Sequence, residues 1–184
     1  MTQAVNIHTP SPTVFVVDDD EAVRTALARL LKTAGYQDRD FASAEAFRGA
    51  LGSAMGRRGQ TDAVVYVHGF NNTMAEGVYR VAQMHHDLQV PSVAVHYAWP
   101  SRGSALGYVY DRDSALFARS GFEDLLQEVG AAGAREIVIV AHSMGAALTM
   151  ETLRQMALGA QSHLLDRVAG VVLISPDIDV DVFR

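Results

Sequence analysis

Ser143 lies in a segment whose residue types fit a nucleophilic turn between a strand and a helix. The β-branched run Ile137–Val140 leads into Ala-His-Ser-Met-Gly at positions 141–145, and a helical pattern follows. Such a turn is so tight that the residues two before and two after the serine must be small. Here they are Ala141, which departs from the strict glycine pattern, and Gly145. We therefore predict a serine nucleophile whose hydroxyl is held above the end of a sheet.

Backbone N–H groups near this turn predict a site for an oxyanion. The N–H of Met144 belongs to the first turn of the following helix, where free N–H groups favour negative charge. A second donor is expected from the loop that follows the strand Ala63–Val67, and Phe70 and Asn71 are the candidates. Gly69 in that loop allows the backbone to approach closely.

A serine nucleophile needs a base, and the base needs an orienting acid. Asp177 follows the strand Val168–Ile174 and is the first candidate for the acid; Asp179 is the second, and either could be a turn residue. The only histidine near the expected oxyanion loop is His68, which would serve as base or would shape that loop through its ring N–H. His142 adjoins the serine on a sharp turn, so we expect its ring to point elsewhere.

The elements needed to position these residues recur as strands that alternate with helices. Strands are predicted at 63–67, 92–96, 137–141 and 168–174, and helices at 74–88, from 111 or 113 to 129, and at 144–158. This alternation implies a mostly parallel sheet covered on both faces, an α/β three-layer sandwich. Trp99 and Arg102 follow the second of these strands, and we expect them to line the mouth of the site.

A separate pattern of strands and helices is predicted for the first third of the chain. Residues 1–12 are predicted to be a flexible arm. Residues 13–51 read as strand, helix, strand and short helix, and residues 52–61, with three glycines and two arginines, read as a linker. The second domain would then span residues 62–184.

Composition excludes several classes of protein. The 184 residues carry a formal net charge of −6, which argues against binding to nucleic acid. There is no cysteine, so disulfides and thiolate metal sites are excluded, and we expect no cofactor and no metal. No apolar run is long enough for a membrane helix, and the N-terminus does not resemble a signal peptide. A cytoplasmic protein with no membrane contact is the expectation.

Residues 62–184 resemble an α/β-hydrolase domain family of unknown function. The matching stretches are 65–71, 98–103, 110–115, 141–145 and 175–179. The resemblance implies an esterase-like or lipase-like serine hydrolase that acts on a small-molecule ester. In α/β-hydrolases the histidine follows the acid, but no histidine follows Asp177 here, and the chain ends at Arg184. We therefore expect a hydrolase fold that lacks its C-terminal strands and has weak or no activity.

Residues 13–51 resemble a second family, the response-regulator receiver domain. The match runs over 14–24 and continues at 30–31, 34–36 and 41–45. In receivers the two acids that follow the first strand, here Asp18 and Asp19, help to hold Mg²⁺ beside a phosphorylated aspartate. The resemblance covers only the opening part of that fold, and the third strand with its aspartate is missing. We read the acidic pair as a helix cap and a relic of that site.

Three functions follow from these readings. The first is a weak esterase that uses Ser143. The second is a signalling module phosphorylated at the receiver-like segment, and the third is a non-catalytic fusion or truncation product. The strand Val168–Ile174 would also be an open apolar edge, which invites pairing with a second copy of the chain or with residues 13–51.

Overall fold

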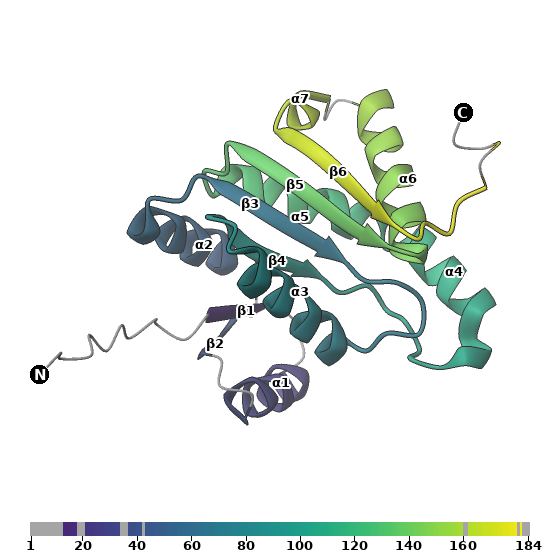
Figure 1. Ribbon diagram of the computed structural model, residues 1–184, viewed down its shortest axis with the longest axis horizontal. Helices are drawn as coiled ribbons and strands as arrows, with labels where there is room; N and C mark the ends of the chain where they lie inside the picture. Colours follow the sequence, from purple (N-terminus) through teal and green to yellow (C-terminus); the bar gives the residue numbers. More distant parts are fainter. Residues whose placement is uncertain are drawn as a thin grey trace, which may run out of the picture. The chain divides into compact units, whose positions relative to one another are not determined.

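Strands and helices alternate along the chain, and every strand pair is parallel (Figure 1). The computed structural model describes residues 13–17, 21–33, 37–41, 43–159, 162–179 and 181. The chain separates into two units, the first ending at Ser43 and the second beginning at Ala44. The elements are β1 (Thr13–Val17), α1 (Glu21–Thr33), β2 (Gln37–Phe41), α2 (Ala44–Arg58), β3 (Asp62–Val67), α3 (Met74–Leu88), β4 (Val93–Tyr97), the 3₁₀ turn η1 (Ala105–Gly107), α4 (Tyr108–Phe117), α5 (Arg119–Ala131), β5 (Glu136–His142), α6 (Met144–Leu158), α7 (Ser162–Leu165) and β6 (Val168–Ile174).

The first unit contains β1, α1 and β2. The two strands pair in parallel from Thr13 opposite Gln37 to Val17 opposite Phe41, and α1 makes the connection. A parallel pair needs such a crossover, because a tight turn can join only antiparallel strands. These elements are the strand, helix and strand that the sequence predicts for this segment.

The second unit is built on a four-stranded sheet in the order β4-β3-β5-β6. This confirms the predicted α/β class with a parallel sheet. Because all four strands run the same way, their carboxyl ends meet at one edge. The segments that follow β3, β4, β5 and β6 begin with His68, Ala98, Ser143 and Ser175, so the predicted site residues converge there.

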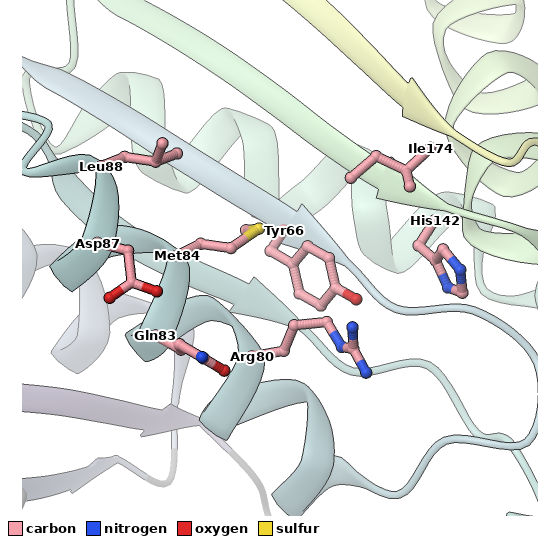
Figure 2. Close-up of a pocket in the computed structure, with 8 residues that line it drawn as sticks. All are labelled: Tyr66, Arg80, Gln83, Met84, Asp87, Leu88, His142 and Ile174. Carbon is pink, nitrogen blue, oxygen red and sulfur yellow. The ribbon is translucent and has the colours of Figure 1, made fainter.

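Helices cover the two faces of this sheet unequally. In Figure 1, α5 and α6 lie behind the sheet and α3 lies in front of it, over β3 and β4. Ile137 and Ile139 of β5 point to the α5 and α6 side and are at most 1% exposed. On the α3 side, Val172 and Ile174 of β6 are 49% and 39% exposed. A hollow opens there between α3 and the ends of β5 and β6 (Figure 2).

Local sequence explains both ends of α3. Thr73 accepts a hydrogen bond from the N–H of Glu76 at 3.3 Å, and the Glu76 carboxylate accepts from the N–H of Thr73 at 2.8 Å. This capping box satisfies N–H groups that have no partner inside the helix. At the other end Gln89 adopts a left-handed conformation with φ 47°, and Pro91 follows. The helix therefore begins and ends where the sequence predicts.

The glycine-rich segment predicted as a linker is helical up to Arg58. The side chains of Leu51 and Met55 are buried, with exposed fractions of 0% and 3%. Their packing therefore outweighs the low helix propensity of the glycines. Gly52 also permits a close approach, because a Cβ there would lie 3.0 Å from the carbonyl oxygen of Ala132. The sequence therefore placed the end of this helix too early.

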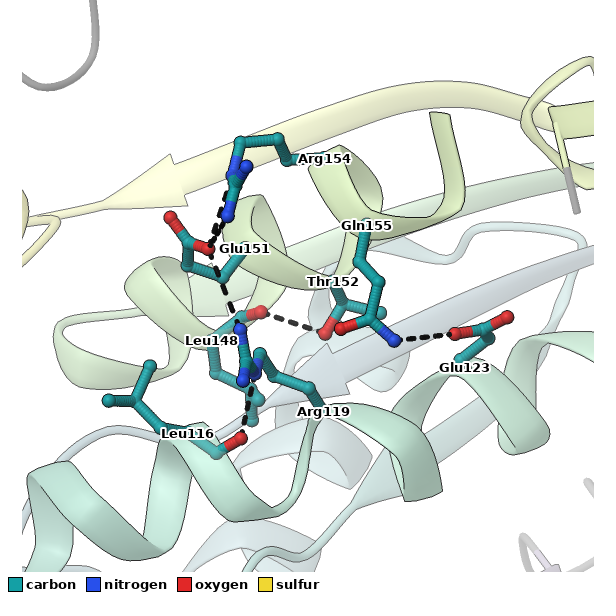
Figure 3. A network of polar contacts seen from close by, with 8 residues as sticks. All are labelled: Leu116, Arg119, Glu123, Leu148, Glu151, Thr152, Arg154 and Gln155. Carbon is teal, nitrogen blue, oxygen red and sulfur yellow. Dashed lines mark hydrogen bonds and ion pairs between the residues drawn. The ribbon is translucent and has the colours of Figure 1, made fainter. Parts of the chain in front are cut away.

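The long helix predicted up to Val129 begins earlier, at Tyr108, and breaks at Ala118 into α4 and α5. The hydroxyl of Tyr97 donates to the carbonyl of Ala118 at 2.7 Å, which supports the chain at the break. Polar contacts then join this region to α6 (Figure 3): Arg119 lies 3.7 Å from Glu151, and Gln155 donates to Glu123 at 3.3 Å. Within the described ranges, no helix is both long enough and apolar enough to cross a membrane.

Candidate active site

Ser143 occupies a strained turn between β5 and α6. Its φ of 52° and ψ of −122° lie in a region that residues with a side chain rarely adopt. Two backbone hydrogen bonds hold the turn: the N–H of Ser143 donates to Ile174 at 3.0 Å, and its carbonyl accepts from Asp177 at 3.1 Å. This turn at Ser143, which we call the elbow, is therefore anchored to β6 and to the residues that follow it. Its side chain makes no capping hydrogen bond.

Two glycines let the loop after β3 approach the elbow. A Cβ at Gly145 would overlap the carbonyl oxygen of His68 and would lie 2.8 Å from that of Val67. A Cβ at Gly69 would lie 2.9 Å from the Cβ of Ser143. At Gly145 the opposing atoms are all backbone, so only glycine fits there; at Gly69 a Cβ would also lie 2.6 Å from Nδ1 of His142.

This approach brings the candidate oxyanion donors to the elbow. Met144 is the first residue of α6, so its N–H has no partner within the helix. Phe70 and Asn71 follow Gly69 in the facing loop, and Asn71 has a φ of 55°. Across the described residues, the N–H groups of these three residues make no hydrogen bond to the protein.

Asp177 lies beside the elbow through its backbone, and its side chain meets a partner that the sequence did not reveal. The hydroxyl of Tyr108 donates to Oδ2 of Asp177 at 2.7 Å. This hydrogen bond raises the pKa of Tyr108, and partial burial adds to it. Tyr108 also meets the ring of Phe70 edge-on at 5.4 Å. The second acid candidate, Asp179, accepts from the N–H of Asp181 at 2.8 Å, as a turn residue does.

His68 is buried at 1% exposure, and both of its ring nitrogens face backbone atoms. Nδ1 lies 2.9 Å from the carbonyl of Gly69, and Nε2 accepts from the N–H of Trp99 at 3.2 Å. In the neutral ring a proton on Nδ1 would donate to Gly69 and leave Nε2 to accept from the Trp99 N–H; Nε2 also lies 3.1 Å from the Trp99 carbonyl. Burial lowers the pKa of His68, in agreement with the neutral form.

A column of four rings supports this edge of the sheet from the α3 side. His68 stacks on Trp99 with ring centroids 4.9 Å apart, and His96 lies 5.5 Å from His68 and 5.7 Å from Tyr66. A Cβ at Gly77 of α3 would overlap the His96 ring, so glycine is required there. Burial, and then the neighbouring His68, lowers the pKa of His96 to about 3.

The loop after β4 is held from below by an acid to which the sequence assigned no role. Asp111 is completely buried and accepts from the hydroxyl of Ser101 at 2.6 Å and from the N–H of Arg102 at 2.9 Å. Trp99, expected at the mouth, is only 3% exposed, and its indole N–H donates to the His68 carbonyl at 2.8 Å. The Trp99 side chain therefore helps to hold the loop in place. Arg102 is exposed and lies over the ring of Tyr110 at 4.0 Å.

Among the described residues, no histidine ring makes a hydrogen bond to Ser143. His142 instead lines the hollow on the α3 side, and His85 contacts the carbonyl of Ser92 at 2.7 Å. Asp18 and Asp19 lie outside the described residues. The described part of the chain contains no group of three or more His, Asp or Glu side chains able to hold a metal ion.

Comparison with known proteins agrees with the α/β fold of the second unit. Residues 43–184 match the family described as "Alpha/beta hydrolase of unknown function (DUF900)". The match includes α2 and leaves most of the receiver-like segment outside it. Searches of curated proteins and of solved structures give no match.

Proposed function

Because the chain belongs to the alpha/beta-hydrolase family of unknown function, we propose that it is a serine hydrolase that cleaves small carboxylic esters through Ser143. The observation that carries the proposal is the strained conformation of Ser143, with φ 52° and ψ −122°, at the first turn of α6. A strained conformation lowers the stability of the fold, so it is usually retained only where it serves a function. The conformation also lifts the hydroxyl off the sheet, towards the end where α/β sheets bind ligands.

In this proposal the ester carbonyl lies between the elbow and the loop after β3. The N–H of Met144 and the N–H of Phe70 or Asn71 would donate to the carbonyl oxygen as it gains charge. Each such donor typically contributes about 10²–10³-fold in rate. Gly69 supports this assignment, because its lack of a side chain leaves the approach to Ser143 open.

We assign the acid role to Asp177 in preference to Asp179. Asp177 is tied to the elbow by its N–H, and the Tyr108 hydroxyl fixes the direction of its carboxylate. Asp179 is occupied by its own turn. Tyr108 is then a positioning residue, and together with Phe70 it supplies an aromatic wall for the substrate.

The general base is the least complete part of the proposed catalytic site. His68 is held by the backbone on both sides of its ring, which supports the loop-shaping role over proton transfer. Loss of the histidine from a complete triad costs about 10⁶-fold in kcat. We therefore expect turnover only with activated esters, whose leaving groups depart without taking up a proton.

Labelling by a fluorophosphonate probe tests the nucleophile directly. We expect one covalent adduct, located at Ser143 by mass spectrometry, and slow release of p-nitrophenolate from p-nitrophenyl acetate. Ser143→Ala should abolish both, whereas Ser104→Ala, at an exposed serine of the neighbouring loop, should retain both. An unlabelled wild-type protein, or equal labelling of the Ser143→Ala variant, would refute the proposal.

A further inference from the structure

The hollow on the α3 side of the sheet is a second candidate binding site. Its volume is about 320 Å³, at the lower end of the range of pockets that hold small molecules. It lies between α3 and the ends of β3, β5 and β6, and Ser143 does not line it. The residues that matter for its chemistry are Tyr66, Arg80, Met84, Leu88, His142 and Ile174.

One end of the hollow has three polar groups that make no hydrogen bond among the described residues: the Tyr66 hydroxyl, Nδ1 of His142 and the Arg80 guanidinium. Tyr66 is 0% exposed, and within the described residues its hydroxyl makes no hydrogen bond. Buried hydroxyls almost always have a partner, so an unpaired one requires an explanation. Arg80 is exposed and makes no hydrogen bond or ion pair with any described residue. Figure 2 shows its guanidinium and the Tyr66 hydroxyl directed towards the same place, near His142.

The positive charge of Arg80 acts on this end of the hollow. It lowers the pKa of His142, after burial, and it opposes the rise that burial causes in the pKa of Tyr66. An anion placed here would meet a full positive charge and a hydroxyl donor, which are the groups that bind carboxylates well. Asp87 lies near the C-terminal end of α3, away from the Arg80 guanidinium, so an anion would be repelled from that part of the hollow.

The remaining walls are hydrocarbon. Met84 and Leu88 extend from α3, and Ile174 from β6 faces them across the hollow. Leu88 and Ile174 are 69% and 39% exposed, so they present apolar area that a ligand could remove from water. A charged head at one end and an alkyl chain along the other fit this lining.

We propose that this hollow binds a monocarboxylate with a short alkyl chain, whose carboxylate accepts hydrogen bonds from Tyr66 and Arg80 and whose chain lies on Met84, Leu88 and Ile174. The site is separate from the elbow, so it does not depend on the hydrolase proposal. It gives the Tyr66 hydroxyl a partner, which it does not have among the described residues.

Titration of the full chain with octanoate, followed by amide NMR shifts, tests this inference. We expect saturable binding, with Tyr66→Phe and Arg80→Met each weakening the affinity about 10-fold, since a hydrogen bond to a charged group is typically worth at least that factor. Arg57→Met, at an exposed arginine of α2, is the matched control and should bind as the wild type does. Ser143→Ala should also leave octanoate binding unchanged.

Two further ligands distinguish the contribution of the carboxylate to the affinity from that of the alkyl chain. Acetate lacks the chain and octanol lacks the charge, so each should bind at least about 10-fold more weakly than octanoate. The inference is overturned by absence of saturation with octanoate, by equal binding of octanol, or by an unchanged affinity in Arg80→Met. It is also overturned if Ser143→Ala loses binding, which would place octanoate at the elbow. Because Arg80 is exposed, Arg80→Met keeps the test valid even if Tyr66→Phe fails to fold.

Discussion

Acidification is expected to destabilise the second unit because the ring nitrogens of His96 are buried there in the neutral form. Both ring nitrogens are buried without a hydrogen-bond partner among the described residues, and the pKa in the folded protein is lowered to about 3. In the unfolded chain the pKa returns to about 6.5. Below pH 6.5 the unfolded chain therefore takes up a proton that the folded protein refuses, and folding stability is lost as the pH falls.

The size of the effect follows from the two pKa values. Each pH unit in this window costs about 1.4 kcal/mol, so lowering the pH from 7.5 to 5.0 should reduce the free energy of unfolding by about 2 kcal/mol through His96 alone. The lowered pKa of His68 acts in the same direction. His96→Leu removes the first contribution and leaves the second.

Urea unfolding at the two pH values measures this difference. The single tryptophan, Trp99, is buried beside His68, so its fluorescence reports on the unit of interest. We expect the wild type to lose about 2 kcal/mol more than His96→Leu between pH 7.5 and 5.0. His86→Gln, at an exposed histidine of α3, should behave as the wild type. Equal losses in wild type and His96→Leu would refute the reasoning.

Four other outcomes follow from the structure. Gly145→Ala should destabilise the protein by about 1–3 kcal/mol in urea unfolding, because the methyl group would overlap the His68 carbonyl; no loss would contradict the close approach. Asp111→Ala should cost at least about 2 kcal/mol, because Ser101 and the N–H of Arg102 lose a buried charged acceptor; unchanged urea unfolding would count against this. Asp177→Asn should lower the pKa of Tyr108 towards its ordinary value, seen as earlier tyrosinate absorbance in a pH titration; an unaltered titration would dismiss the hydrogen bond. Val172→Lys should weaken concentration-dependent association in analytical ultracentrifugation if chains pair through the edge of β6, where Val172 is 49% exposed; association that persists in the variant would argue against that route.

Elements with local signals were predictable from the sequence. The capping box at Thr73 and the helical spacing after it locate α3, and the small residues around Ser143 locate the elbow and the start of α6. In both cases the physics acts within five residues of the chain. The parallel sheet follows from the alternation of such elements, so the fold class could also be predicted.

Features that depend on distant contacts were missed. Tyr108 and Asp177 are 69 positions apart, and only folding brings the hydroxyl to the carboxylate. Asp111 was visible as part of a motif, but its burial beneath the loop of Ser101 was not. In α2 the glycines predicted a linker, whereas the burial of Leu51 maintains the helix. Propensity is a weak guide wherever packing acts against it.

The backbone at residue 143 is held by Ile174 and Asp177 without help from the serine side chain. A glycine there would adopt the same turn with less strain, by about 1–3 kcal/mol. In the hydrolase that we propose, shape and reactivity at this position are thus separable properties: a Ser143→Gly variant would keep the turn and could not form the covalent bond. Such a variant would retain the proposed ester substrate intact, so that its bound pose could be observed.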